Sequence, residues 1–259
     1  MNIKAKKSLG QNFLEDEVIL KKIADSITTK DSDLIIEIGP GQGALTKYLK
    51  KKNSFLICYE LDERLKEVLK KMENEKTKII FKDFLQADIL KDSECFNYEN
   101  IYIIANIPYY ITTPIIKHVM CLEKLKSMTI LVQKEVAERL TAKPGTKAYG
   151  SLTVYLNYYF NIKYLFNVNK HAFNPVPKVE SAVINFERIN EKVTIKNETL
   201  FFKLIEDAFK MKRKTLKNNL KAYDWNKIKE VLNEKNLPED IRAENLSLEN
   251  FAAIANHLS

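Results

Sequence analysis

The sequence predicts an α/β fold, in which a sheet of parallel strands carries helices on both faces, followed by a small C-terminal all-helical domain. Short apolar runs alternate with amphipathic stretches over the first two-thirds of the 259 residues, an alternation typical of strands joined by helices. After about residue 188 the chain contains no Gly and one Pro, and its apolar spacing is helical. We therefore expect one domain over residues 1–188 and a second over residues 189–259.

The strands are expected where Ile, Leu and Val occur in short runs. Runs without strict alternation indicate strands that are buried on both sides. The expected strands are residues 33–38 (DLIIEI), 55–59 (FLICY), 78–81, 101–105 (IYIIA) and 127–132 (SMTILV). Two further strands, near residues 158–166 and 181–187, would close one edge of the sheet.

The helices are expected between these strands. In residues 62–72, the side chains of Leu65, Val68, Leu69 and Met72 recur at helical spacing. The other expected helices are residues 44–51, 113–122 and 134–140. Residues 141–151 (TAKPGTKAYGS) are rich in Gly, Pro and Lys, which indicates an exposed loop.

The composition restricts the partner and the compartment. A net charge of +8 favours a polyanionic partner, because Lys and Arg release counterions from phosphates. The three cysteines, Cys58, Cys95 and Cys121, are far apart and form no C-x-x-C pair. That pattern argues against a disulfide framework or a zinc site. We expect a cytoplasmic protein without a bound metal or a membrane span, since no apolar run approaches about 18 residues.

A glycine-rich segment, EIGPGQG at residues 37–43, separates the first expected strand from its helix. Glycines there allow a tight turn and close approach of the backbone to a ligand. A dinucleotide fingerprint would need glycine at Thr46 or Ala44, and neither is glycine. The G-x-G-x-G spacing after an acidic residue instead resembles motif I of Class I S-adenosylmethionine-dependent methyltransferases.

The ends of the next two strands carry acids that suit this cofactor, S-adenosyl-L-methionine. Glu60 offers two acceptor oxygens for the ribose hydroxyls, and Asp83 is placed to accept from the adenine amine. The expected cofactor contacts from these segments are Gly39, Gly41, Gly43, Glu60, Leu61, Asp83, Phe84 and Asn106. The alternative is a plain turn with two solvent-exposed acids.

The tetrapeptide Asn106-Ile107-Pro108-Tyr109 follows the fourth expected strand, and ligands bind at the carboxyl ends of such strands. An aryl amine is a poor nucleophile because its lone pair is delocalised. The Asn106 side-chain oxygen and the Ile107 carbonyl can each accept one N–H of the amine, which aims its lone pair at the sulfonium methyl. Pro108 stiffens the turn, and Tyr109 offers a face for stacking. The alternative is an ordinary proline turn.

A second aromatic candidate is Phe173, in the proline-stiffened segment FNPVPKV at residues 173–179. Its ring is expected on the other face of an inserted base. The alternative is that Phe173 fills an edge of the core.

Together these motifs resemble the ribosomal RNA adenine N6,N6-dimethyltransferase family. The similarity is greatest to the branch that modifies two adjacent adenosines near the 3′ end of small-subunit RNA. The matching segments are KKSLGQNFL (residues 6–14), EIGPGQG (37–43), NIPYYITTP (106–114), FNPVPKVESAVI (173–184) and KRKTLKNNL (212–220). The resemblance implies that Asn12 and Leu14 line the cofactor pocket. Tyr110 is a departure, because this branch commonly has Asn there.

The basic residues are concentrated in two places. Seven lie between Lys203 and Lys221 against two acids, and others precede the first acid at the N-terminus. The expected RNA contacts are Lys6, Lys7, Lys210, Lys212, Arg213, Lys214 and Lys217. The expected partner is small-subunit ribosomal RNA within an immature subunit, bound by a monomer with a role in subunit biogenesis. The alternative for these residues is a solvated helix face.

Two other functions stay open. The antibiotic-resistance methyltransferases that modify one large-subunit adenosine share the cofactor motif and the NIPY segment. A ribosome-assembly or transcription-associated factor could keep the fold and lose catalysis, although Asn106, Tyr109 and Glu60 are intact.

Overall fold

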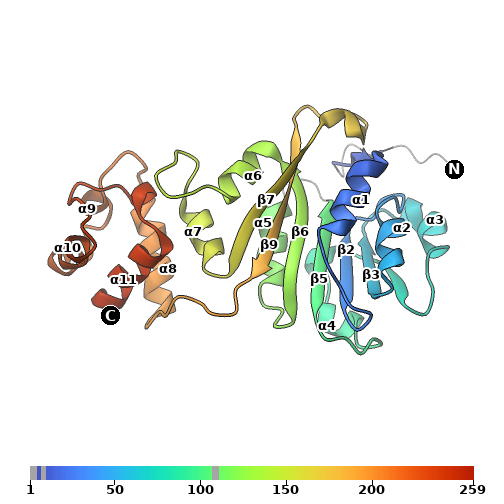
Figure 1. Ribbon diagram of the computed structural model, residues 1–259, viewed down its shortest axis with the longest axis horizontal. Helices are drawn as coiled ribbons and strands as arrows, with labels where there is room; N and C mark the ends of the chain where they lie inside the picture. The colour runs from blue at the N-terminus through green and yellow to red at the C-terminus, as the bar shows by residue number, and fades with distance from the viewer. Residues whose placement is uncertain (1–4, 7–9, 107–110) are drawn as a thin grey trace. The chain divides into compact units, whose positions relative to one another are not determined.

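The computed structural model describes residues 5–6, 10–106 and 111–259 (Figure 1). The chain forms two compact units, each with its own core. Unit 1 comprises Met1–Ala137 and Lys163–Arg188, and unit 2 comprises Glu138–Ile162 and Ile189–Ser259. Unit 2 therefore contains residues 189–259, which we expected to form the second domain, and also residues 138–162, which we expected in the first.

Unit 1 is built on a mixed sheet, to which the described residues contribute seven strands in the order β4-β3-β2-β5-β6-β9-β7. The strands are β2 (Leu34–Ile38), β3 (Phe55–Glu60), β4 (Thr77–Phe81), β5 (Ile101–Asn106), β6 (Leu125–Gln133), β7 (Phe160–Val168) and β9 (Ser181–Arg188). The first five in this order are parallel, as expected. Strand β9 is antiparallel to β6, and β9 and β7 form the edge pair that the sequence predicted.

Both faces of the sheet are covered. Ile35 of β2 and Ile104 of β5 pack in one core cluster with Leu20, Leu49 and Leu69. Leu20 belongs to helix α1 (Glu17–Asp25), Leu49 to α2 (Thr46–Leu49) and Leu69 to α3 (Lys66–Lys70). Successive side chains of a strand point to opposite faces. Ile36 points the other way and is equally buried at 0% exposure, so the second face is covered too.

The expected helices are present but shorter or divided. The segment 44–51 forms α2 and the 3-10 turn η2 (Lys50–Lys52), and 62–72 forms η3 (Glu63–Leu65) and α3. The other helices of this part are η4 (Phe84–Gln86), α4 (Ile89–Asp92), α5 (Thr112–Val119) and α6 (Lys134–Leu140). Helix α1 was not expected. Asp16 caps it by accepting from the backbone N–H groups of Val18 and Ile19, a contact worth about 1 kcal/mol.

A two-stranded sheet ties the N-terminal arm, which we define as residues 10–14, to the proline-rich segment. Strand β1 (Phe13–Leu14) pairs antiparallel with β8 (Phe173–Asn174), after the turn η6 (Lys170–Ala172). Glu15 extends the pairing through its N–H to the Ala172 carbonyl at 2.9 Å. Residues distant in sequence are thus brought together.

Unit 2 is helical, as the sequence predicted for its larger part. Its helices are α7 (Ser151–Asn157), α8 (Glu198–Ala208), α9 (Leu216–Asn219), α10 (Trp225–Glu234), the turn η7 (Ala243–Asn245) and α11 (Leu248–Leu258). Phe201, Leu216, Ile228 and Phe251 meet in its core. Within residues 5–6, 10–106 and 111–259, no helix has the length and apolarity needed to cross a membrane.

Candidate active site

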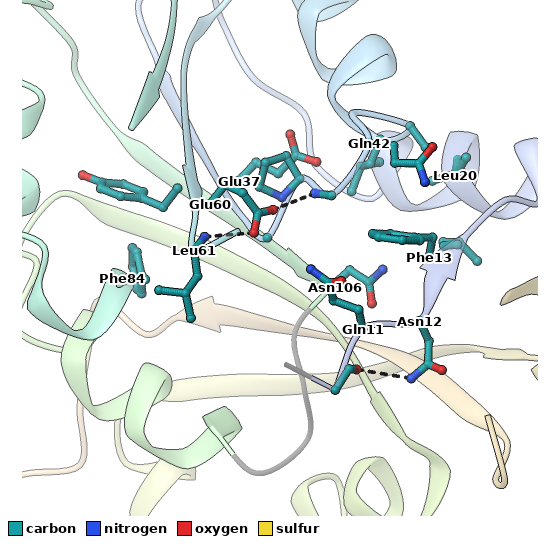
Figure 2. Close-up of a pocket in the computed structure, with 18 of the residues that line it drawn as sticks. Gln11, Asn12, Phe13, Leu20, Glu37, Gln42, Glu60, Leu61, Phe84 and Asn106 are labelled. Atoms are coloured by element: carbon teal, nitrogen blue, oxygen red, sulfur yellow. Dashed lines mark hydrogen bonds between the residues drawn. The ribbon is translucent and has the colours of Figure 1, made fainter. Parts of the chain in front are cut away.

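A cavity of about 650 Å³ opens at the carboxyl ends of the parallel strands of unit 1 (Figure 2). This is where ligands bind in open α/β sheets, because the loops diverge there. Its walls come from the arm, the loop after β2, the ends of β3, β4 and β5, and β8. Of the expected site residues, Asn12, Leu14, Gly39, Gly41, Glu60, Leu61, Asp83, Phe84, Asn106 and Phe173 line it.

Two residues of the glycine loop that line the cavity pass close to other segments. Gly39 has φ +73°, and a Cβ there would lie 3.2 Å from the Asn106 carbonyl oxygen. Gly41 has φ +56°, and its Cβ would lie 3.0 Å from the Phe13 ring. Both positions therefore need glycine, for the left-handed backbone and for the close approach.

Gly43 is the expected glycine of this loop that packs most closely against another side chain. It is not among the cavity-lining residues. A Cβ at Gly43, where φ is +79°, would lie 2.6 Å from Met72 Sδ and closer still to Met72 Cε. This glycine lets Met72, just beyond α3, pack against the loop, and its expected contact with the cofactor stays a prediction.

Glu60 is held by three backbone N–H groups. Its Oε2 accepts from Gly41 at 3.0 Å, and its Oε1 accepts from Leu61 and Asp62, each at 2.9 Å. The side chain is buried. Burial raises the pKa of Glu60, while the three donors act in the opposite direction. The carboxylate is thus fixed in orientation, and Oε2, which accepts only one of the three N–H groups, retains a lone pair that a hydroxyl can use.

The end of the cavity beside Glu60 is apolar. Leu61 is 55% exposed and Phe84 is buried, and Figure 2 shows both at this end. Phe84 is fixed by edge contacts with the rings of Tyr59 and His118. Asp83 caps η4 by accepting from the Leu85 N–H through Oδ1 at 3.0 Å. An apolar wall beside an acceptor is suited to a purine ring with an exocyclic amine.

Asn106 ends β5 and lines the cavity. The rest of the expected reacting segment, Ile107, Pro108 and Tyr109, lies outside the described residues, as does Tyr110. Phe173 also lines the cavity, is 3% exposed, and packs in the same core cluster as Leu14. Phe173 therefore belongs to the core and also borders the cavity, and its contact with an inserted base stays a prediction.

Sequence reasoning missed Glu37 as a buried member of this site. It lines the cavity, and its Oε2 accepts from Thr46 Oγ1 at 2.7 Å and from Cys58 Sγ at 3.4 Å. Burial raises the pKa of Glu37 to about 7. The signal was an acid inside the apolar run DLIIEI, because a charge in a fully buried strand needs partners.

The expected RNA contacts fall in both units. In unit 1, Lys6 is exposed and Lys7 lies outside the described residues. In unit 2, the exposed residues Lys212, Arg213 and Lys214 occupy the turn before α9. Lys210 Nζ lies 3.8 Å from Asp207, and Lys217 Nζ lies over the Trp225 ring, 5.6 Å from its centroid.

Comparisons with known proteins show the family of this chain. The family model described as ribosomal RNA adenine dimethylase matches residues 2–259. The chain belongs to the ribosomal RNA adenine dimethylase family. A relative from Alkaliphilus oremlandii, named ribosomal RNA small subunit methyltransferase A, is 42% identical, over 99% of this chain and 92% of its own. One of the same name from Enterococcus faecalis is 40% identical, over 98% and 90%.

Solved structures show that this dimethylase family member has the Class I methyltransferase fold. A dimethyladenosine transferase from Plasmodium falciparum superposes with a TM-score of 0.77 at 27% identity, covering 93% of this chain and 95% of its own. The 23S rRNA methyltransferase ErmE superposes with a TM-score of 0.80 at 24% identity, covering 95% and 99%. The latter likeness supports the fold alone. The family match over the chain makes the protein an rRNA adenine methyltransferase.

Proposed function

We propose that the protein uses S-adenosylmethionine to dimethylate the N6 amines of two adjacent adenosines near the 3′ end of small-subunit ribosomal RNA. The observation that carries the proposal is the cavity in which Glu60, Asp83 and Asn106, at or just after the ends of β3, β4 and β5, line one space. The large-subunit alternative is not favoured, since the curated relatives quoted above are named small-subunit enzymes.

The cavity fits S-adenosylmethionine, which supplies an electrophilic methyl group when bound. Glu60 would accept from the ribose through its free lone pair, and Gly41, which lines the cavity beside it, would let the ligand approach the loop backbone closely. Leu61 and Phe84 would flank the adenine, and Asp83 would accept from its amine. Asn12 and Leu14 would close the pocket from the arm.

The chain's own contribution to chemistry is positioning, which can supply several kcal/mol of barrier reduction. The Asn106 side-chain oxygen would accept one N–H of the target amine and orient its lone pair. When bound, the cofactor would give up its methyl group from sulfur and leave as a neutral thioether, and the positively charged amine would then release a proton to solvent. Ile107, Pro108 and Tyr109 keep the roles that the sequence suggests, and Phe173 would pack against the inserted base.

The substrate is expected to bind through exposed cations. Lys212, Arg213 and Lys214 form no ion pair with a described residue and stand together in one turn, a density that suits phosphate binding. Lys6 and Lys7 would add contacts to the RNA backbone. We propose that the partner is an immature small subunit, that the protein acts as a monomer, and that it works in the cytoplasm.

The decisive experiment is methyl transfer from labelled S-adenosylmethionine to two substrates. One is small subunits purified from cells that lack the modification, and the other is protein-free large-subunit RNA. Mass spectrometry should find N6,N6-dimethyladenosine only in the small-subunit RNA, at two adjacent positions. Product on the large-subunit RNA alone would overturn the proposal.

A further inference from the structure

The N-terminal arm forms one wall of the cavity. Gln11, Asn12 and Phe13 line it, and Figure 2 shows them along one side, with Glu60, Leu61 and Phe84 along the other. The β1–β8 pairing holds the C-terminal end of the arm. The N-terminal end reaches a different partner, the loop that follows β3.

Gln11 makes that contact with both ends of its amide. Its Nε2 donates to Asp62 Oδ2 at 2.9 Å, and its Oε1 accepts from the Lys6 N–H at 2.8 Å. Arg64 Nη2 lies 3.5 Å from the same Oε1. The amide thus joins the arm to residues more than fifty positions later in the chain.

Asp62 is prepared to receive this donor. Arg64 Nε donates to Asp62 Oδ1 at 2.8 Å, and Arg64 Nη2 pairs with Oδ2. The Asp62 side chain is 4% exposed and that of Arg64 46% exposed. The contact with Arg64 lowers the pKa of Asp62 to about 2, so the acceptor is ionised and its hydrogen bonds are charge-assisted.

Asp62 also contacts Glu60, the residue proposed to bind the ribose. Its backbone N–H donates to Glu60 Oε1 at 2.9 Å. A continuous series of contacts therefore runs from Lys6 through Gln11 and Asp62 to the Glu60 carboxylate. Asn12, the next residue of the arm, lines the cavity and donates from Nδ2 to the Gly10 carbonyl at 3.3 Å.

We propose that Gln11, through Asp62 and Arg64, is a positioning residue for cofactor binding. It holds the arm across the cavity and fixes the position of Asn12 relative to Glu60 on the opposite wall. This inference rests on the proposed use of the cavity for S-adenosylmethionine. We call the contacts of Gln11 with Asp62 and Arg64 the clamp. Without the clamp, the arm would have to become ordered each time a ligand binds, and the loss of conformational entropy would weaken the affinity.

The test uses Gln11→Glu, which keeps the side-chain length and places a carboxylate against Asp62. Gln11→Met serves as a second variant that removes both hydrogen bonds without adding charge. We expect the Kd for S-adenosylhomocysteine, measured by calorimetry, to rise roughly tenfold to hundredfold in Gln11→Glu, and less in Gln11→Met. The KM for S-adenosylmethionine should rise in the same way, while kcat, measured at saturating S-adenosylmethionine, should change much less.

The matched control is Asn53→Asp. Asn53 Nδ2 donates to Asp31 Oδ2 at 2.6 Å, an amide–carboxylate contact whose residues do not line the cavity. This control should leave the Kd unchanged. Limited proteolysis within the arm should be slowed by S-adenosylhomocysteine in wild type and much less in Gln11→Glu, a readout that a merely structural role would not change.

The outcomes separate the two proposals. If wild type fails to bind S-adenosylmethionine and S-adenosylhomocysteine, the proposed function fails. If wild type binds both and the folded Gln11→Glu and Gln11→Met variants bind them equally well, the function stands and the clamp is wrong. An equal rise in Kd and in arm cleavage for Asn53→Asp would also overturn the clamp.

Discussion

The backbone N–H of Gly41 donates to Glu60 Oε2 at 3.0 Å, and this contact joins the loop after β2 to the end of β3. The glycine is needed because a side chain there would meet the Phe13 ring. The carboxylate is needed because the Leu61 and Asp62 N–H groups point at its other oxygen. Loop, strand end and arm therefore depend on one another before any ligand arrives.

Replacement of Glu60 by Gln should weaken cofactor binding. One end of the amide would present a donor to backbone N–H donors, and one acceptor for the ribose would be lost. We expect the Kd for S-adenosylhomocysteine to rise roughly tenfold to hundredfold. Calorimetry measures it, with Glu63→Gln as the control because Glu63 is exposed and not a cavity-lining residue. A Kd equal to that of wild type would remove Glu60 from the site.

Gly43→Ala should reduce stability without affecting the cofactor. The backbone at φ +79° is strained for Ala, and Met72 must move, so the free energy of unfolding should fall by about 1–3 kcal/mol. Gly41→Ala, beside Phe13 and Glu60, should reduce both stability and affinity. Urea denaturation and calorimetry on the two variants separate the effects. A large loss of affinity in folded Gly43→Ala would restore the cofactor role expected for Gly43.

Glu37 should make stability depend on pH. Its pKa is raised from 4.5 to about 7 by burial, so the folded state binds a proton more tightly than the unfolded state. The resulting stability is fully present below pH 4.5 and is lost as the pH rises to about 7. The loss is on the order of 3 kcal/mol. Chemical denaturation of the ligand-free protein between pH 4.5 and 8 measures it, and Glu37→Gln should abolish this part of the slope.

The strands were predictable because their signal is local. Ile35 and Ile36 stand in a run whose length and apolarity fit a strand that is covered on both sides, and the structure buries both completely. The acids Glu60 and Asp83 could be placed for the same reason, because each follows such a run directly.

Contacts between distant segments were not predictable in this way. The Gln11–Asp62 hydrogen bond spans 51 positions. The pairing of Leu14 with Phe173 joins the first and the last part of the sequence that forms unit 1. The role of Gly43 depends on where Met72 lies, which local spacing does not determine. Helix α1 was missed although Asp16 is a good cap, and α7 begins where only a loop was expected.

The cations before α9 should govern RNA affinity. Replacement of Lys212, Arg213 and Lys214 by Ala should weaken binding to the small subunit and flatten its salt dependence, by about 0.7–0.9 in slope for each lost phosphate contact. The control replaces Lys227, Lys229 and Lys235, which removes the same charge from α10 and its end. Filter binding from low to high salt provides the measurement. Equal slopes for the two triple variants would refute the assignment.

Asn106→Ala should slow methyl transfer strongly while leaving the protein folded. Its side-chain oxygen is the acceptor proposed for the target amine, and loss of one such contact typically costs about 100- to 1,000-fold in rate. Single-turnover methylation of small subunits with saturating S-adenosylmethionine measures the chemical step apart from affinity. Asn106→Asp keeps the oxygen acceptor and should retain more activity than Asn106→Ala.

The same variant separates catalysis from an assembly role. If methylation is the whole function, cells that carry Asn106→Ala should match a deletion strain in growth and in small-subunit maturation. If the catalytically inactive protein restores maturation, it also acts by binding, through surfaces such as the turn of Lys212, Arg213 and Lys214. A strain in which that turn is neutralised and Asn106 is intact completes the comparison, because it should lose binding first and methylation only as a consequence.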